Sequence, residues 1–165
     1  MLTGLAPLID SHTRLLILGS FPGVASLASQ QYYGHPQNSF WKMLHAIWPD
    51  GPSMAVDSSY QNRSKWLLSK RVGLWDVYAA CERAGSLDSA IRNAKLNDFS
   101  SLKMRCPKLQ AIAHNGGESF RHSRHTVSLG LPVFKLPSTS PANASMSFER
   151  KLAAWREVFD AQGLV

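Results

Sequence analysis

The sequence is poor in cysteine. Its two cysteines, Cys81 and Cys106, lie far apart and outside any Cys-x-x-Cys pattern. Such a pair does not indicate a disulfide framework or a structural zinc site. It is also too small to supply the thiolate ligands that an iron–sulfur cluster ordinarily requires. His122 and His125 stand three residues apart, but no carboxylate pattern completes a metal site around them. We expect neither a metal nor another cofactor.

Long apolar runs are also absent. No stretch approaches the roughly 18 apolar residues of a membrane-spanning helix. Residues 1–14 lack the basic start and long apolar core of a signal peptide. We therefore expect a cytoplasmic protein with no membrane partner. Linkers, internal repeats and low-complexity segments are missing too, so residues 1–165 are predicted to form a single domain, which we expect to act as a monomer.

Acidic side chains are scarce. Eleven Asp and Glu stand against 18 Lys and Arg, which gives a net charge of +7 and an isoelectric point near 9.7. A folded surface with this surplus attracts polyanions such as nucleic acid. Many small basic proteins have no such partner, so charge by itself leaves DNA binding open.

What is present is an alternation of short apolar runs and helical patterns, which predicts an α/β protein. The expected fold is a three-layer α/β/α sandwich around a central, mostly parallel four-stranded sheet. Strands are expected at residues 14–18, 72–78, 109–113 and 132–136. Helices are expected at residues 38–47 and 60–70, from Asn97 or Asp98 to Arg105, from about Gly117 and from Ser147, with a short helical turn at residues 85–88.

Three loops follow the predicted strands that end at Leu18, Ala113 and Leu136. Parallel sheets bind ligands beyond the carboxyl ends of their strands, so we expect these loops to share a site. The first begins with Gly19-Ser-Phe-Pro-Gly23, a turn that exposes backbone N–H groups. An ordinary tight turn is the alternative, but the Tyr32, Tyr33 and His35 that follow it favour a recognition loop.

The segment GSFPGVASLASQQYYGHPQNSFW resembles the first motif of the hypoxanthine-DNA glycosylases, a branch of the uracil-DNA glycosylase superfamily. VGLWDVY, GSLDSAI, Asn97-Asp98, Asn115-Gly116 and LPSTSPANA are similar to its later blocks and occur in the same order, from Leu15 to about Trp155. The resemblance implies hydrolysis of the N-glycosidic bond of a deaminated base, preferentially hypoxanthine, in double-stranded DNA. An abasic site would remain.

The resemblance also implies roles for residues of the first loop. Mismatch-specific uracil relatives carry an asparagine that orients the attacking water where this chain has Phe21. An aromatic ring cannot hold that water, but it can stack on a flipped base. The water is then assigned to Asn38, although this residue also precedes a predicted helix and would serve as a cap worth about 1 kcal/mol. Base contacts are further expected from Ser20, Tyr33 and His35.

The two later loops complete the expected site. Asn115 is assigned to the base edge, where one amide can pair with the adjacent acceptor and donor of either hypoxanthine or uracil; an Asn-Gly turn is the alternative. His114 stands where the family usually has an apolar residue. Contacts to DNA phosphates are expected from Ser26, Ser138, Thr139, Ser140, Asn143, Arg121 and Arg124.

Two other functions remain open at this point. The first is a uracil or mispaired-thymine glycosylase on the same fold. The second is a protein that binds lesions with little catalysis, which the phenylalanine at position 21 keeps in consideration.

Overall fold

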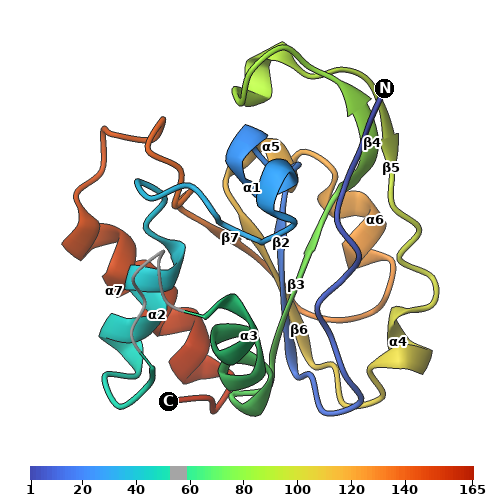
Figure 1. Ribbon diagram of the computed structural model, residues 1–165. Coiled ribbons are helices and arrows are strands. Elements are labelled where there is room, and N and C mark those ends of the chain that lie inside the picture. The colour runs from blue at the N-terminus through green and yellow to red at the C-terminus, as the bar shows by residue number, and fades with distance from the viewer. Residues whose placement is uncertain (53–58) are drawn as a thin grey trace.

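The computed structural model describes residues 1–52 and 59–165. Its main sheet has four strands in the order β3-β2-β6-β7, and every neighbouring pair is parallel, as predicted (Figure 1). The strands are β2 (Leu15–Gly19), β3 (Val72–Asp76), β6 (Ala111–Asn115) and β7 (Val133–Leu136). Every residue of β2, β3 and β6 is buried. Burial on both faces explains why these strands are apolar runs rather than alternating patterns.

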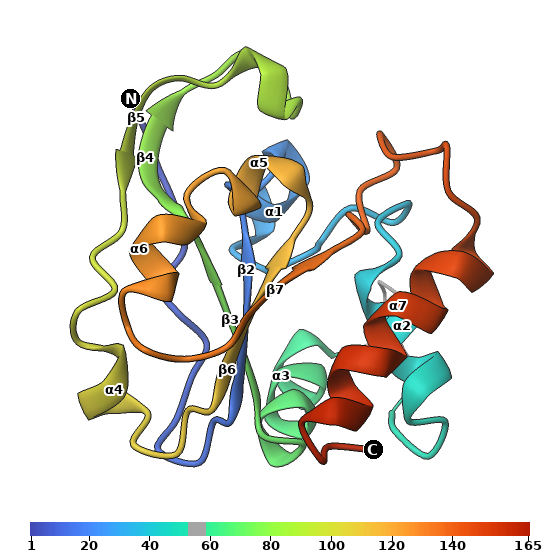
Figure 2. The ribbon, with the colours of Figure 1, turned by 180° about the vertical axis from the view of Figure 1, so that it is seen from behind.

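Helices cover both faces of the main sheet, which gives the three expected layers (Figures 1 and 2). One layer holds α2 (Phe40–Ile47), α3 (Tyr60–Ser69) and α7 (Phe148–Ala161). The other holds α4 (Leu102–Arg105), α5 (Gly117–Phe120) and α6 (Ser123–Val127). The side chains of β2 alternate between the layers: Leu15 and Ile17 pack into the α2 side of the core, and Leu16 and Leu18 into the α4 side.

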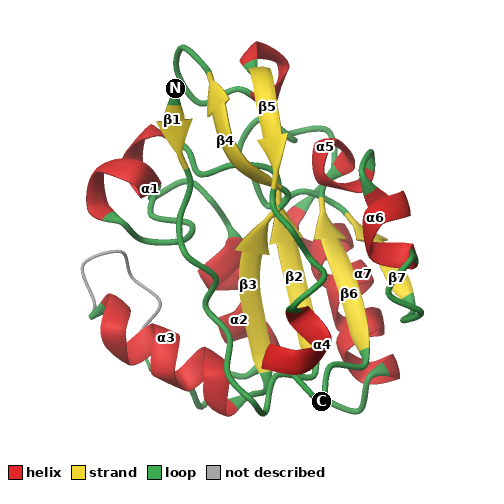
Figure 3. Ribbon diagram, turned by 90° about the vertical axis from the view of Figure 1, so that its right-hand side faces the viewer, coloured by secondary structure: helices red, strands yellow, loops and turns green. Residues whose placement is uncertain are grey.

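A second, smaller sheet was not expected from the sequence. It is antiparallel, in the order β1-β4-β5, and consists of β1 (Leu2–Thr3), β4 (Tyr78–Glu82) and β5 (Arg92–Leu96). The strand predicted at residues 72–78 is therefore two strands, which part at Val77. Figure 3 shows β4 and β5 extending past the carboxyl ends of the main strands. The two strands form a hairpin that carries a short 3-10 turn, η1 (Asp88–Ala90), where a helical turn was predicted.

The helix predicted from Asn97 or Asp98 to Arg105 is wrong in its first half. Only the last turn forms, as α4, and neither residue caps it. Asn97 instead donates its side-chain N–H to the carbonyl of Asp76, and the Asp98 carboxylate accepts the backbone N–H of Ser100. The long carboxyl-terminal helix agrees with prediction, since the Ser147 hydroxyl accepts the backbone N–H of Arg150 at its start. No helix among the described residues has the length and apolar character to cross a membrane.

Candidate active site

The three expected loops do meet, at the carboxyl edge of the main sheet. They surround a cavity of about 1060 Å³. Its wall includes residues 19–26 from the first loop, residues 115–117 from the second and residues 135–143 from the third. It also includes Asp76 at the end of β3 and residues 86–89 at the tip of the hairpin, which the sequence analysis had not placed there. Large ligand sites in proteins have comparable volumes.

Asp76 lies directly beside Gly19 on the floor of this cavity, because the two residues are paired at the ends of β3 and β2. A side chain at residue 19 would clash, since a Cβ there would lie 2.6 Å from Asp76 Oδ1. Glycine therefore leaves room for the carboxyl. Only 6% of Asp76 is exposed, and its Oδ2 is buried without a hydrogen-bond partner in the part of the chain that the structure describes.

The surroundings of Asp76 favour its neutral form. Burial raises the pKa of its carboxyl to about 7, and the nearby negative charge of Asp88 acts in the same direction. Arg83 opposes this shift, but its guanidinium donates to the Gly85 carbonyl and lies over the Phe21 ring rather than on the carboxyl. A buried acid with this pKa can donate a hydrogen bond near neutral pH. A lone Asp after a strand gave too little signal to assign this position from the sequence.

Asn115, Tyr33 and Thr139 form one network at the opposite side of the floor. The Asn115 amide donates to the Tyr33 hydroxyl at 3.1 Å and to Thr139 Oγ1 at 3.0 Å. Its Oδ1 accepts the backbone N–H of Thr139 at 3.1 Å. Both amide hydrogens of Asn115 are thus already used within the protein. Reading a base edge with a donor would require Asn115 to exchange one of these bonds, so its role there stays a prediction.

The backbone of the second loop explains why a glycine follows Asn115. Gly116 has a φ of +101°, a conformation that favours glycine, and its N–H donates to the carbonyl of Leu136. A Cβ at this position would also lie 3.1 Å from the Cβ of Ser138. The Asn-Gly turn and the polar contacts of Asn115 are therefore two parts of one arrangement. His114 is fully buried, with its ring nitrogens on Ser119 and Thr126, and it does not line the cavity.

Asn38 lines the cavity just before α2, and its side chain is half-buried. The N-cap of α2 is Ser39, whose side chain makes no capping bond, so Asn38 is not the cap that the sequence predicted. Asn38 Oδ1 instead accepts the backbone N–H of Phe40, the first residue of the helix, at 3.0 Å. Among the described residues, none accepts a hydrogen bond from Asn38 Nδ2, and none uses the second lone pair of Oδ1. The bond to Phe40 and contact with a ligand or water are thus compatible. His35, also in the wall, is exposed and accepts the Gln37 N–H through Nδ1.

The aromatic residues predicted for base contact lie in the wall. Phe21 is 7% exposed, and much of its ring packs in the core beneath the Arg83 guanidinium. Tyr33 stacks on Phe40, with ring centroids 4.1 Å apart, and its backbone has a φ of +55°. The site is thus flanked by two rings held in place by packing. Ser20, which also lines the cavity, donates its hydroxyl to Asp88 Oδ1 at 2.6 Å.

The hydroxyls predicted to contact phosphates divide into two groups. Ser26 is 5% exposed and accepts the Gly34 N–H, while Thr139 is 1% exposed and used by Asn115, so these two brace the loops. Ser138 and Ser140 are more accessible and accept the backbone N–H groups of Ser140 and Ala142. Partly exposed Asn143 donates to the carbonyl of Ser138.

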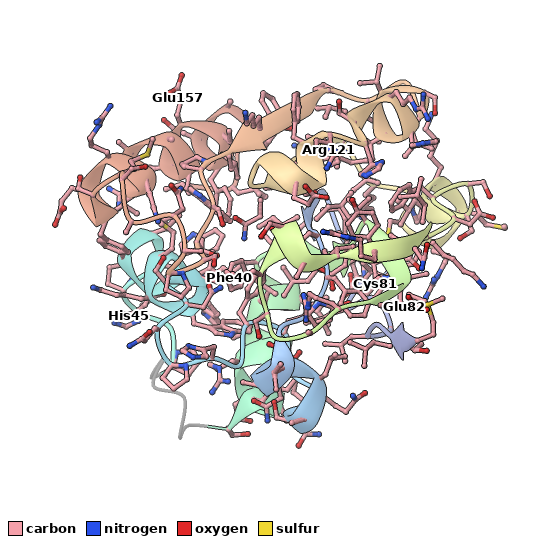
Figure 4. The ribbon with its side chains drawn as sticks, turned by 90° about the horizontal axis from the view of Figure 1, so that it is seen from above. Phe40, His45, Cys81, Glu82, Arg121 and Glu157 are labelled. Carbon is pink, nitrogen blue, oxygen red and sulfur yellow. The ribbon has the colours of Figure 1, made fainter. Side chains whose placement is uncertain are left out.

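The two arginines predicted to contact DNA lie outside the cavity wall. Arg121 and Arg124 are both exposed, on the segment from α5 to α6. Arg121 pairs with Glu118 at 3.0 Å, which offsets part of its charge. In Figure 4, which looks down on the carboxyl edge of the sheet, Arg121 lies by α5 and apart from Phe40 on α2. The structure therefore allows these side chains a role beside the cavity but not inside it.

A parallel α/β sheet with a polar, aromatic-flanked cavity at its carboxyl edge defines an α/β protein that binds a ligand at its strand ends. The model of the Uracil DNA glycosylase superfamily matches residues 6–159. The chain belongs to this superfamily, which confirms the resemblance found in its motifs.

Relatives and a solved structure agree with this assignment. A protein of Methanosarcina acetivorans named hypoxanthine DNA glycosylase is 41% identical over 157 residues, covering 94% of this chain and 96% of the relative. A protein of the same name from Methanosarcina barkeri is 38% identical over 156 residues, with the same coverage. A solution NMR structure from Methanosarcina acetivorans superposes with a TM-score of 0.84 at 37% identity, covering 98% of both chains.

Proposed function

We propose that this protein is a DNA glycosylase that hydrolyses the N-glycosidic bond of deoxyinosine in duplex DNA and leaves an abasic site. The observation that carries the proposal is the cavity at the strand ends of a superfamily member whose near-full-length relatives are named for hypoxanthine. A base inside a duplex is out of reach, so the nucleotide must first be extruded into the cavity.

Four residues of the cavity wall have a role in the proposed reaction. Phe21 and Tyr33 flank the extruded base, and Asn38 orients the water that attacks the sugar carbon. An amide is too weak a base to deprotonate water, so this arrangement suits a dissociative path in which the sugar gains positive charge first. Negative charge collects on the departing base, where the neutral carboxyl of Asp76 is placed to donate a hydrogen bond.

Uracil is the competing substrate, because it presents the same pairing of acceptor and donor as hypoxanthine. The superfamily model that matches this chain is named for uracil DNA glycosylases. Uracil is therefore included among the substrates to be tested. The six-membered ring of uracil offers less stacking area to the flanking rings of Phe21 and Tyr33 than the two fused rings of hypoxanthine. Stacking is worth roughly 1–3 kcal/mol per base, so we expect hypoxanthine to be preferred by about one or two orders of magnitude.

The test is single-turnover excision from otherwise identical duplexes that carry hypoxanthine, uracil, xanthine or ethenoadenine, with abasic sites detected by alkaline strand cleavage. Hypoxanthine should react fastest, and the Asn38→Ala protein should excise it about two to three orders of magnitude more slowly than wild type. Excision of uracil at an equal or higher rate would transfer the proposal to uracil. Binding of hypoxanthine duplexes without any cleavage would identify a lesion-binding protein instead.

A further inference from the structure

Asp88 is an acidic side chain in the wall of a cavity that has to receive DNA. It begins η1, at the tip of the β4–β5 hairpin, and it is exposed. Among the described residues, Asp76 and Asp88 are the acids of the cavity wall. Asp76 is buried, which favours its neutral form. A carboxyl at the protein surface is ionised near neutral pH, so Asp88 supplies the negative charge of this wall.

Two hydrogen bonds hold the hairpin tip, and with it Asp88, against the first loop. The Ser20 hydroxyl donates to Asp88 Oδ1 at 2.6 Å, and nearby Ser86 accepts the backbone N–H of Val24 through Oγ at 2.9 Å. The hairpin runs beside α1 (Val24–Ser29) in Figures 1 and 2. Desolvation raises the pKa of the Asp88 carboxyl, and the hydrogen bond from Ser20 opposes this rise. No described residue bonds to Asp88 Oδ2 or forms an ion pair with this carboxylate, so one oxygen is available to a ligand.

A negative side chain at this place opposes DNA binding. DNA phosphates repel it, whereas the protein as a whole carries a net charge of +7 that attracts them. The hydrogen bond from Ser20 does not require the charge either, because an amide oxygen at residue 88 would accept the same hydroxyl. Neither binding nor local structure therefore accounts for a carboxylate here. A positive charge that forms on the substrate during the reaction would account for it.

We propose that the Asp88 carboxylate faces the sugar of the extruded nucleotide and stabilises the positive charge that develops on the sugar as the glycosidic bond breaks. The base enters as far as the buried floor beside Asp76, so the sugar stays in the outer part of the cavity, where Asp88 is exposed. The proposal rests on the glycosylase function proposed above.

Asp88 acts in this reaction by its charge alone. The electron pair of the C1′–N bond leaves with the base, water forms the new C1′–O bond, and a proton of this water neutralises the base through the solvent. The carboxylate stays ionised throughout. Because the positive charge on the sugar is greatest in the transition state, the contact lowers the barrier more than it strengthens substrate binding.

Asp88→Asn tests the contact, because asparagine keeps the shape and can still accept the Ser20 hydroxyl. Single-turnover excision of hypoxanthine at saturating protein should fall about ten- to a hundredfold. Affinity for undamaged duplex, measured by fluorescence anisotropy, should rise about two- to fivefold, because a repulsion is removed. Asp88→Glu keeps the charge and should excise faster than Asp88→Asn. Glu82→Gln, at an exposed acid of β4 outside the cavity wall, is the matched control and should leave the excision rate unchanged.

A cationic analogue of the reacting sugar tests the same contact without catalysis. One duplex carries a pyrrolidine in place of the nucleoside, which presents a positive charge, and a second carries a neutral tetrahydrofuran. Wild type should bind the pyrrolidine duplex about tenfold more tightly than the tetrahydrofuran duplex, and Asp88→Asn should lose most of this preference.

The two measurements separate failure of the inference from failure of the proposed function. A preference for pyrrolidine that depends on Asp88, without any excision by wild type, would support the place of Asp88 beside the sugar and reject the glycosylase activity. An equal preference in wild type and Asp88→Asn, or an unchanged excision rate in Asp88→Asn, would overturn the role of Asp88. Parallel losses of excision and affinity would also overturn it, because they would identify a structural contact.

Discussion

Asn115 and Thr139 hold each other through two hydrogen bonds in opposite directions. The amide of Asn115 donates to Thr139 Oγ1, and the backbone N–H of Thr139 donates to Asn115 Oδ1, at 3.0 and 3.1 Å. The pair fastens the end of β6 to the loop after β7. Because the Thr139 carbonyl also accepts the backbone N–H of Ser39 at 3.0 Å, the link continues to the start of α2 beside Asn38. One asparagine thus sets the spacing between two walls of the cavity.

Replacing Asn115 should weaken the whole protein as well as the site. Asn115→Ala leaves the N–H of Thr139 without its partner, and we expect the free energy of unfolding to fall by roughly 2–4 kcal/mol. Thr139→Val removes one hydrogen bond with little change in shape and should cost only about 1 kcal/mol. Urea denaturation of the three proteins measures both values. Unchanged stability in Asn115→Ala would mean that Asn115 acts on the ligand alone.

Asn38 should separate into a structural and a catalytic role. Asn38→Ala loses the bond to the Phe40 N–H at the start of α2, at a cost of about 1 kcal/mol, and Asn38→Ser keeps a hydroxyl that can accept this N–H. Both variants lose the amide that orients water, so single-turnover excision should fall by about two to three orders of magnitude in each. Thermal unfolding supplies the control, because only the alanine variant should melt earlier. Near-normal excision by the serine variant would leave Asn38 with a structural role only, at the start of α2.

The buried carboxyl of Asp76 should make stability depend on pH. Its pKa is about 7 in the folded protein and about 3.9 in an unfolded chain. The pKa of this carboxyl is higher in the folded protein than in the unfolded chain. Its contribution to the free energy of unfolding is therefore fully present below pH 4 and is lost as the pH rises through 7. The loss amounts to roughly 3–4 kcal/mol by pH 8. Asp76→Asn should abolish this loss, so its stability relative to wild type should grow from pH 4 to pH 8.

Chemical denaturation across this pH range measures the difference between the two proteins. The subtraction cancels the contributions of other titrating groups, such as His114, whose burial lowers its pKa to about 4. If the neutral acid also donates to the base, wild-type excision should decline above pH 7 while that of Asp76→Asn stays level. If the stability of the two proteins changes with pH in the same way, burial does not raise the pKa of the Asp76 carboxyl.

Arg121 and Arg124 should contribute to DNA affinity through phosphates. Each neutralised phosphate adds about 0.9 to the slope of log affinity against log salt concentration. Replacing both residues by alanine should flatten this slope by about one to two, and less if the Glu118 pair keeps Arg121 from the DNA. Lys65→Ala with Lys108→Ala, on α3 and just before β6, is a control of equal charge change. A flattening caused only by the lysine pair would place the DNA elsewhere.

The main sheet was predictable because its strands are buried on both faces, which leaves runs such as Leu15-Leu-Ile-Leu18 without alternation. The second sheet was not, because β5 is exposed throughout and β1 has two residues, so neither carries an apolar pattern. The missing first half of the helix after Asn97 has a similar cause. The side chain of Asn97 is used by the carbonyl of Asp76, a partner 21 residues away that no local rule anticipates.

The candidate site, like the fold, was predictable only in part. Loop positions at the ends of buried strands were predicted, and Asn38 and Asn115 do line one cavity. What each side chain does there depends on partners from distant segments. Ser26 and Thr139 resembled phosphate ligands in the sequence, yet burial turns them toward Gly34 and Asn115. The carboxyl of Asp76 can lie in the cavity because the paired residue, Gly19, has no side chain there. This relation between two strands could not be read from the sequence.

The strand β1 has a practical consequence for anyone who handles this protein. Leu2 and Thr3 pair with Cys81 and Ala80, and the N–H of Gly4 donates to the carbonyl of Ala79. The first residues of the chain therefore form the outer edge of the sheet from which the β4–β5 hairpin extends. An affinity tag fused ahead of Met1 would adjoin that edge strand and could disturb the hairpin. A tag after Val165 would follow α7, at the opposite end of the molecule (Figure 1).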